Sequence, residues 1–254
     1  MKECATILLA NCAMASMSKI KGILFDYGGT LDSRAQHWSE IIWQGYCSVN
    51  APVSKELFRE AYVYAERFLG REPIVKPNWN FIELMHVKID IQAKYLESNY
   101  GCAVDNQPFV DAVAKYCYDK ARECVEESKL VLDELKENYQ LGVVSNFYGN
   151  LKTVMADFGV LDYFKCVIES AVVGIRKPDS EIFRCGVNAL NLTADEVLVV
   201  GDSYEKDIVP AMQIGCDVVW YEGVGWETQA NDGISVKKVH NLADLRKTVL
   251  AELN

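Results

Sequence analysis

The sequence has few histidines and irregularly spaced cysteines, and both features argue against a metal centre built from nitrogen or sulfur. Its three histidines are His37, His86 and His240, and their spacing fits no metal-ligand motif. Its nine cysteines include no Cys-x-x-Cys pair. We therefore expect neither zinc nor disulfides, but reduced and mostly buried thiols in a reducing, cytoplasmic compartment.

Positive charge and long apolar runs are also scarce. The 26 lysines and arginines are outnumbered by 36 acidic residues, which gives a formal net charge of −10. Nucleic-acid-binding proteins usually present a basic surface, so no nucleic acid is expected as a partner. The sequence has no run of about 18 apolar residues, so no membrane span is expected either. Nothing in the sequence indicates an obligate protein partner.

Residues 1–17 are expected to be an extension that is disordered or weakly packed. The apolar stretch Cys4–Ala15 is similar to a signal segment, with Ala13-Met14-Ala15 as its cleavage-like end. Asn11 interrupts this stretch, and Glu3 opposes the positive leader that such segments carry. A translation start at Met17 is an equally good interpretation.

Five short apolar runs predict the strands of a mostly parallel sheet. They are apolar throughout rather than alternating, which is typical of strands covered on both faces. Amphipathic helical stretches separate them, and this alternation predicts a doubly wound α/β core. The predicted strands are Ile20–Phe25, Leu141–Val144, Cys166–Ile168, Val197–Val200 and Val218–Tyr221. The predicted helices are Lys129–Asn138, Leu151–Phe158, Ser180–Leu190 and Tyr204–Ile214.

Residues 34–126 interrupt this alternation, because they contain no strand-like run. Helices punctuated by prolines are predicted there at Ala35–Ser48, Lys55–Leu69, Asn80–Ser98 and Gln107–Glu126. We therefore divide the chain into the extension at 1–17, a core made of 18–33 and 127–254, and an inserted α-helical cap domain at 34–126. An insertion directly after the first strand is well placed to cover a site at that edge of the sheet.

Polar side chains stand at the carboxyl ends of three predicted strands, where open α/β sheets bind their ligands. These residues are Asp26, Ser145 with Asn146, and Asp202. Carboxylates on neighbouring strand ends repel each other unless a cation lies between them, and Mg²⁺ prefers such oxygen ligands. Asp207 lies near enough in the sequence to complete or orient that cation site.

The remaining chemistry of this edge suits an anionic, phosphorylated substrate. Lys177 would neutralise the substrate, and the Ser145 hydroxyl would donate hydrogen bonds to its oxygens. Asp26 is then the candidate nucleophile, which attacks phosphorus to give an aspartyl-phosphate.

Taken in order, these residues resemble the four motifs of the haloacid dehalogenase (HAD) superfamily of hydrolases. The matching stretches are Asp26 with Gly29-Thr30-Leu31, Ser145-Asn146, Lys177-Pro178-Asp179, and Gly201-Asp202-Ser203 with Asp207. Each motif alone is weakly specific, but their order makes the resemblance specific. It implies a Rossmann-like core with a helical cap inserted after the first strand.

The resemblance also implies a role for each residue in a Mg²⁺-dependent, phosphatase-like enzyme that acts on a small phosphorylated metabolite. Asp26 would be the nucleophile. The metal would be held or supported by Asp26, the Gly28 carbonyl, Asp202 and Asp207. The phosphoryl group would be bound by Ser145, Lys177, Asn146 through its backbone, and Thr30 in the turn.

The sequence departs from the family pattern at Gly28. Phosphatases of the family usually have an aspartate two residues after the nucleophile, which protonates the leaving group and then activates water. Glycine can do neither, and such acid–base help is typically worth about 10²–10⁴ in rate. The enzyme would then use good leaving groups, take its proton from Asp32, His37 or the cap, or bind phosphate while turning over slowly.

Alternative functions stay open beside this one. The chain could be a catalytically impaired phosphate-binding or interaction protein that keeps the HAD fold. A phosphonatase would tolerate a small residue at Gly28 but needs a cap lysine to form a Schiff base. A dehalogenase needs no metal, which fits a paired Asp202 and Asp207 poorly. The cap lysines available for a Schiff base are Lys55, Lys76, Lys88 and Lys94, and nothing in the sequence singles one out.

Two further expectations concern packing. We interpret Asp32 as the N-cap of the next helix rather than as a proton donor. We interpret most of the cap aromatic residues as its core rather than as a substrate pocket. These aromatic residues are Trp38, Trp43, Tyr62, Tyr64 and Trp79.

Overall fold

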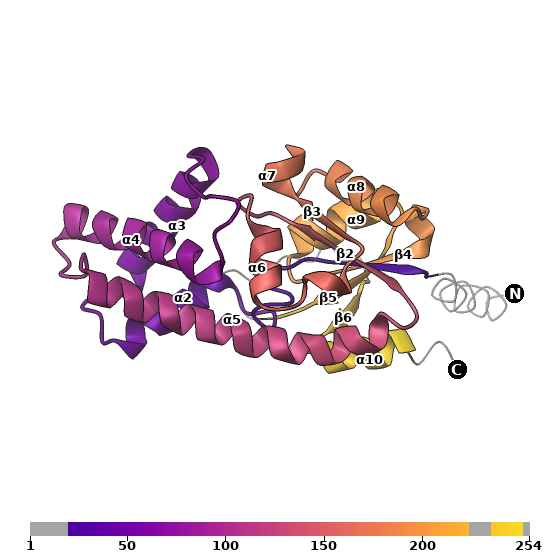
Figure 1. Cartoon of the computed structure of the whole chain (residues 1–254), viewed down its shortest axis with the longest axis horizontal. Helices are drawn as coiled ribbons and strands as arrows, with labels where there is room; N and C mark the ends of the chain where they lie inside the picture. The colour runs from indigo at the N-terminus through magenta and orange to yellow at the C-terminus, as the bar shows by residue number, and fades with distance from the viewer. Residues whose placement is uncertain (1–19, 224–234, 251–254) are drawn as a thin grey trace, which may run out of the picture.

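The computed structural model describes residues 20–223 and 235–250, so the expected extension at residues 1–17 lies outside the described residues. A six-stranded sheet with the order β3-β2-β1-β4-β5-β6 forms its centre (Figure 1). Every neighbouring pair is parallel, which confirms the predicted α/β class. The strands are β1 (Gly22–Phe25), β2 (Gln140–Ser145), β3 (Cys166–Glu169), β4 (Val197–Gly201), β5 (Asp217–Tyr221) and β6 (Lys237–Val239).

The first strand lies in the middle of the sheet, hydrogen-bonded to β2 on one side and to β4 on the other. All four of its residues are buried, as its continuous apolar sequence predicts. Because the strands are parallel, their carboxyl ends meet at one edge of the sheet. Asp26 follows β1 directly and is therefore held between the ends of β2 and β4.

Helices cover both faces of the sheet (Figure 1). Successive side chains of a strand point to opposite faces, so Leu24 and Phe25 belong to different apolar clusters. The Phe25 face is covered by α6 (Leu151–Asp157), α10 (Leu242–Leu250) and the end of α5 (Gln107–Leu135). The Leu24 face is covered by α8 (Glu181–Leu190) and α9 (Val209–Gln213).

A helical cap is inserted between β1 and β2 and lies beside the sheet (Figure 1). It consists of α2 (Trp38–Ser48), α3 (Lys55–Arg71), α4 (Phe81–Tyr100) and the first part of α5. The local sequence fixes its helix starts, because Ser54, Asn80 and Asn106 each accept a hydrogen bond from the first turn that follows. Asn80 and Glu83 form a full capping box. The predicted helical insertion is therefore confirmed.

The last helix of the cap differs from the prediction, because α5 is one helix rather than two. It joins the predicted helices Gln107–Glu126 and Lys129–Asn138. Its buried residues Val125, Ser128 and Leu132 continue one face across the expected break, and no proline or glycine interrupts them. Thus α5 runs through the position at which we divided cap from core.

The remaining elements are short, and some were not predicted. The predicted helix Tyr204–Ile214 is a π-helical turn, η3 (Tyr204–Ile208), followed by α9. Neither α10 nor β6, a short edge strand whose first two residues are exposed, was predicted. The other short elements are η1 (Leu161–Tyr163), α7 (Ser170–Val173) and η2 (Ala194–Glu196).

Seven of the cysteines lie among the described residues, and all seven are free thiols. Only Cys117, Cys124 and Cys216 are buried, and Cys47 is exposed, so burial is less general than predicted. Among the described helices, none combines the length and the apolar character needed to cross a membrane.

Candidate active site

The carboxyl ends of β1, β2 and β4 bring predicted site residues into one cluster. Asp26 follows β1, Ser145 ends β2, and Asp202 follows β4. The Ser145 hydroxyl donates to Asp26 Oδ1 at 3.2 Å. The buried Thr30 hydroxyl lies 3.4 Å from both Asp26 Oδ2 and Asp202 Oδ1, so it bridges the two acids.

Lys177 lies buried at the centre of this cluster, with only 4% of the residue exposed. Its Nζ donates to Asp26 Oδ1 and to Asp207 Oδ1, each at 2.6 Å. Burial alone would lower the pKa of Lys177, but the Asp207 and Asp26 carboxylates outweigh it and raise that pKa. The ammonium therefore stays charged beside Asp26.

Three acids form a compact group around this ammonium. Asp26, Asp202 and Asp207 each offer a carboxylate oxygen, and these oxygens lie within 4.8 Å of one another. Burial raises the pKa of Asp26 to about 6 despite Lys177. Burial, with repulsion from Asp26 and Asp207, raises the pKa of Asp202 well above its usual value. One lysine cannot neutralise three carboxylates, so these oxygen donors fit a hard divalent cation such as Mg²⁺.

Asp207 is directed into the cluster by η3. The Ser203 backbone N–H donates to Asp207 Oδ2 at 3.0 Å, which leaves Oδ1 for Lys177. π-Helical turns are rare and often occur at functional sites. The π-helical turn thus directs Asp207, which follows β4 in the chain, back toward the carboxyl ends of the strands.

The turn after the candidate nucleophile requires glycine at position 29. Gly29 has a φ of +106°, in the region that side chains disfavour. A Cβ there would lie 2.5 Å from Asp202 Oδ1. The absence of a side chain therefore allows the main chain to pack directly against the acidic group.

Asn146 has a side-chain role that the sequence did not reveal. The Lys177 backbone N–H donates to Asn146 Oδ1 at 2.9 Å, and Asn146 Nδ2 donates to the Lys177 carbonyl at 3.1 Å. This amide pair joins the end of β2 to the loop before α8. Asn146 therefore positions the lysine backbone, whatever its own backbone contributes.

Asp32 does not cap the helix that follows, so that prediction is wrong. The N-cap of α2 is His37, whose ring accepts a hydrogen bond from the Ser39 backbone. Asp32 Oδ1 instead accepts from the Gly29 N–H at 2.9 Å and from Trp38 Nε1 at 3.0 Å. Burial is the main reason that the pKa of Asp32 is raised to about 7. Asp32 fastens the Gly29 turn to the first residue of α2.

A cavity of about 130 Å³ is lined by core residues of this site and by the cap. Gly28, Asn146 and Asp202 line it from the core. A Cβ added at Gly28 would have Trp38 Cδ1 as its nearest neighbour, at 4.0 Å, and Gly28 does not have a left-handed φ. Position 28 therefore has room for a side chain that faces the cavity.

The cap aromatic residues divide between core and cavity. Trp43 packs on the apolar core, as predicted. Trp38 and Tyr62 also pack on that core, yet both line the cavity, so they belong to the site as well. Tyr64 is 43% exposed. The carbonyl of Trp79, which is half-buried, accepts a hydrogen bond from Asn150 Nδ2 at 2.9 Å.

Sequence reasoning missed a charged cluster in the same cavity. Lys88 Nζ donates to Glu66 Oε1 at 2.6 Å and to the Tyr148 hydroxyl at 2.9 Å. The Tyr148 hydroxyl in turn donates to Glu66 Oε2 at 2.6 Å. The three residues come from α3, α4 and the loop after β2, and all line the cavity. No motif marks residues that are so far apart in the chain.

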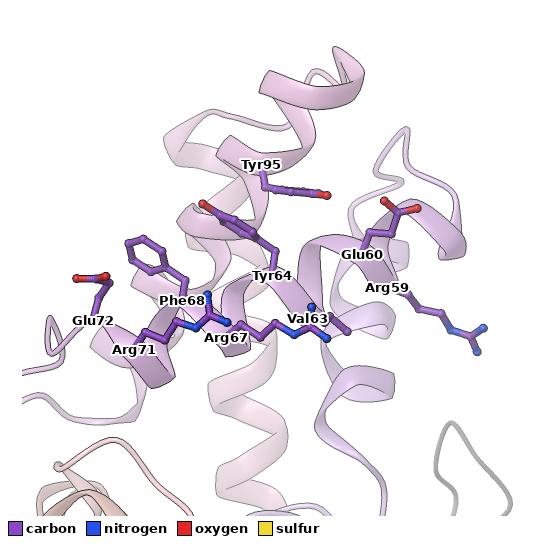
Figure 2. Close-up of a pocket in the computed structure, with 9 residues that line it drawn as sticks. All are labelled: Arg59, Glu60, Val63, Tyr64, Arg67, Phe68, Arg71, Glu72 and Tyr95. Carbon is purple, nitrogen blue, oxygen red and sulfur yellow. The ribbon is translucent and has the colours of Figure 1, made fainter.

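A larger groove on the cap is separate from these acids. It has a volume of about 690 Å³ and is formed by α3 with Tyr95 of α4 (Figure 2). The Tyr64 and Tyr95 rings stack with centroids 4.6 Å apart, and Arg67 and Arg71 lie further along α3. None of the predicted site residues lines this groove, so the smaller cavity is the one that belongs to the candidate active site.

The family model for haloacid dehalogenase-like hydrolases matches residues 65–221, which is more than half of the chain. The chain belongs to this family. The match extends from α3 to β5 and includes Ser145, Lys177, Asp202 and Asp207. Asp26 precedes the matched residues, and its place in this hydrolase site comes from the geometry described above.

Curated relatives include phosphatases. The pyrimidine 5'-nucleotidase YjjG of Escherichia coli K12 is 27% identical over 166 residues, which are 61% of this chain and 71% of YjjG. The glyceraldehyde 3-phosphate phosphatase of Pyrococcus abyssi is 33% identical over 98 residues, which are 37% of this chain and 41% of that protein. The similarity to the second protein therefore covers less than half of either chain.

Solved structures share the fold. The L-2-haloacid dehalogenase RSc1362 has a TM-score of 0.61 and 21% identity, covering 91% of this chain and 99% of its own. The HAD-hydrolase YfnB of Bacillus subtilis, solved bound to magnesium, has a TM-score of 0.57 and 19% identity, covering 91% of this chain and 98% of its own. At such identities, the likeness establishes the fold of a capped HAD protein and not its reaction.

Proposed function

We propose that the protein is a Mg²⁺-dependent phosphatase that hydrolyses a small phosphorylated metabolite through a phosphorylated Asp26. The observation that carries this proposal is the contact of Asp26 with Lys177 and Ser145 beside two further acids. A charged ammonium and a hydroxyl at hydrogen-bonding distance from a carboxylate are the groups needed to hold a phosphoryl group there. The phosphatase names of the curated relatives support the same reaction class.

The first step is attack by Asp26 on phosphorus. Asp26 Oδ1 is held by Lys177 and Ser145, whereas Oδ2, among the residues that the structure describes, has only the long contact with Thr30. Oδ2 is therefore the less strongly bound oxygen and the better nucleophile. It forms the new O–P bond as the bond from phosphorus to the leaving oxygen breaks, and the leaving oxygen carries away the electron pair.

The second step returns the enzyme to its starting state. Water attacks phosphorus, the O–P bond to Asp26 breaks, and its electron pair returns to the Asp26 carboxylate. The phosphate leaves with the water oxygen and one of its protons, and the other proton passes to the leaving-group anion, directly or through solvent. Lys177 and the Ser145 hydroxyl can donate to the phosphoryl oxygens in both steps, where negative charge increases. Asn146 and Asp207 keep the lysine in position by holding its backbone and its ammonium.

The residues that would hold Mg²⁺ are Asp26, Asp202 and Asp207, with the Gly28 carbonyl as a further ligand. When bound, the cation would offset the charge of the acids and polarise a phosphoryl oxygen. The close packing of Gly29 on Asp202 supports this assignment, because it brings main-chain atoms next to the carboxylates.

Gly28 limits the kinds of ester that the enzyme hydrolyses well. It supplies no proton to the leaving oxygen, so acyl and aryl phosphates, whose leaving groups are stable anions, should react best. Asp32 does not replace the missing acid, because both of its oxygens accept from Trp38 and it is not among the cavity residues. His37 does line the cavity and is a titratable side chain to test there.

A phosphonatase reaction is disfavoured by the surroundings of its best lysine. Lys88 is the cap lysine that lines the cavity, but it is paired with Glu66 at 2.6 Å. Burial would lower the pKa of Lys88, yet Glu66 outweighs burial and raises it. A protonated amine cannot attack a carbonyl to form a Schiff base. Dehalogenation is disfavoured because it needs no metal and so does not explain why three acids are grouped together here.

The proposal is tested by measuring hydrolysis of p-nitrophenyl phosphate and acetyl phosphate with Mg²⁺ and with EDTA. Wild-type protein should require the metal, and Asp26→Asn should reduce turnover to background. Turnover that continues in EDTA, or that survives Asp26→Asn, would reject the mechanism. A wide panel of phosphoesters that stays at background, while phosphate and Mg²⁺ still bind in calorimetry, would instead support a non-catalytic phosphate-binding protein.

A further inference from the structure

We infer that Glu66, Lys88 and Tyr148 form a leaving-group subsite that selects phosphorylated substrates with a compact leaving group free of charged substituents and discriminates against those with a second anionic group. This inference rests on the proposed function, because it concerns the part of the substrate that the phosphoryl site does not hold. The three residues line the same cavity as Gly28 and Asp202.

The charges in this subsite balance each other. Lys88 is 5% exposed, and its ammonium lies 2.6 Å from Glu66. Burial would raise the pKa of Glu66, but Lys88 outweighs burial and lowers it, so both groups are ionised. A second phosphate or carboxylate would meet the negative Glu66 as well as the positive Lys88, and its desolvation would gain no net attraction.

The hydrogen-bonding capacity of the subsite is nearly used up. The Glu66 carboxylate accepts from Lys88 and from the Tyr148 hydroxyl. Tyr148 in turn accepts from Lys88. An ammonium has three N–H donors, and these two contacts, within residues 20–223 and 235–250, leave Lys88 with one. One remaining donor suits a single hydroxyl or carbonyl oxygen on the substrate.

The other walls of the cavity are apolar and aromatic. Trp38, Phe81 and Phe147 line it, and the Trp38 and Phe81 rings lie with centroids 5.1 Å apart. With its volume of about 130 Å³, the cavity is smaller than the roughly 300–1,000 Å³ of drug-sized ligand pockets. The ligand class that fits is therefore a small leaving group with an apolar body and one further polar oxygen.

Glu66→Gln is the variant that tests this assignment. Glutamine has the same shape and keeps an oxygen to accept from Lys88, but it removes the negative charge, so the ammonium becomes available to an anion. The two probes are 2-phosphoglycolate and its carboxamide, which differ only in the charge at the end of the leaving group. Each is measured as a competitive inhibitor of p-nitrophenyl phosphate hydrolysis, so neither probe needs to be turned over.

The wild-type protein should bind the carboxamide at least as tightly as the carboxylate. In Glu66→Gln the ratio of the two inhibition constants should shift toward the carboxylate by about tenfold or more. The Lys88 ammonium would then form a hydrogen bond between two charged groups with the carboxylate, which is stronger than its hydrogen bond to the neutral carboxamide. Tyr148→Phe removes one hydrogen bond but no charge, so the ratio should stay near the wild-type value. Glu60→Gln, an exposed position on the same helix in the groove of Figure 2, is the matched control.

The outcomes separate the possible roles of the cluster. If Glu66→Gln weakens the binding of both probes equally, the cluster only holds the cap against the core, and the inference is overturned. An unchanged ratio would overturn it too. If wild-type protein shows no Asp26-dependent turnover, the proposed function has failed, and that result is distinct from either outcome for Glu66. Thermal melts of each variant establish that the proteins compared are folded.

Discussion

Placing an aspartate at position 28 should restore the proton donor that this site lacks. Gly28 lines the cavity beside Asp202, and a Cβ added there would meet nothing nearer than Trp38 Cδ1 at 4.0 Å. Its φ is outside the left-handed region, so a side chain adds no backbone strain. Gly28→Asp is therefore expected to fold as well as the wild type.

The expected gain follows from how freely the new side chain can move. General acid–base catalysis is typically worth about 10²–10⁴ in rate. An unconstrained aspartate has three staggered χ1 positions, so a single productive one reduces the gain by about threefold. The lower limit of the range then gives about thirtyfold, and we expect at least tenfold in kcat for alkyl phosphates. Aryl and acyl phosphates should gain much less, because their leaving groups need little protonation.

The assay compares kcat for an alkyl phosphate, p-nitrophenyl phosphate and acetyl phosphate at saturating Mg²⁺. Gly28→Asn is the matched control, because it has nearly the same shape but no proton to transfer. A folded Gly28→Asp protein that hydrolyses alkyl phosphates no faster than Gly28→Asn would refute the reasoning. The proton would then come from another group, and His37 would be the first residue to replace.

Two further predictions concern the buried charges of the site. Lys177→Met should abolish turnover and lower the free energy of unfolding by about 3–5 kcal/mol at pH 8 in EDTA, because the Asp26 and Asp207 carboxylates lose their counter-charge. Urea unfolding measures this loss, and Lys94→Met, which breaks an exposed ion pair, should change stability little. Asp32 has a folded pKa of about 7, raised by burial, so its native form binds more protons than the unfolded chain and its contribution to stability falls as pH rises. The free energy of unfolding should fall by about 2–3 kcal/mol between pH 5 and 8 for this reason. Asp32→Asn keeps an acceptor oxygen but cannot titrate, so urea unfolding with Mg²⁺ present should show no such fall in this variant. An equal fall in the variant would contradict the assignment.

Much of the core could be predicted because its signals are local. The strands are short apolar runs, and their continuous burial in a parallel sheet makes each run visible in the sequence. The edge strand β6 could not be found in this way, because its exposed residues Lys237 and Lys238 carry no apolar pattern. The split of α5 was an error of the same kind, since Ser128 is polar yet lies on the buried face of the helix.

The site was predictable where parallel strand ends determine it, and hidden where tertiary packing does. Asp26, Ser145 and Asp202 stand at strand ends, so their convergence follows from the sheet. Glu66 and Lys88 lie on separate cap helices, and their pairing depends on how those helices pack. Asp32 was misassigned because its partners, a backbone N–H and an indole, could not be known from the sequence.

The unbroken α5 has a mechanical consequence for the cap. With 29 residues at about 1.5 Å each, it is a rod of about 43 Å that runs along both the cap and the sheet (Figure 1). The chain enters the cap beside this rod, because Arg34 pairs with Glu127 at 2.5 Å and the Ser128 hydroxyl donates to the Leu31 carbonyl at 2.7 Å. At the other end, Arg246 of α10 pairs with Glu134. The cap therefore has no helix break inside α5 that could act as a hinge. Any tilt of the cap relative to the sheet would move the whole rod, together with its contacts to α10 on the same face of the sheet.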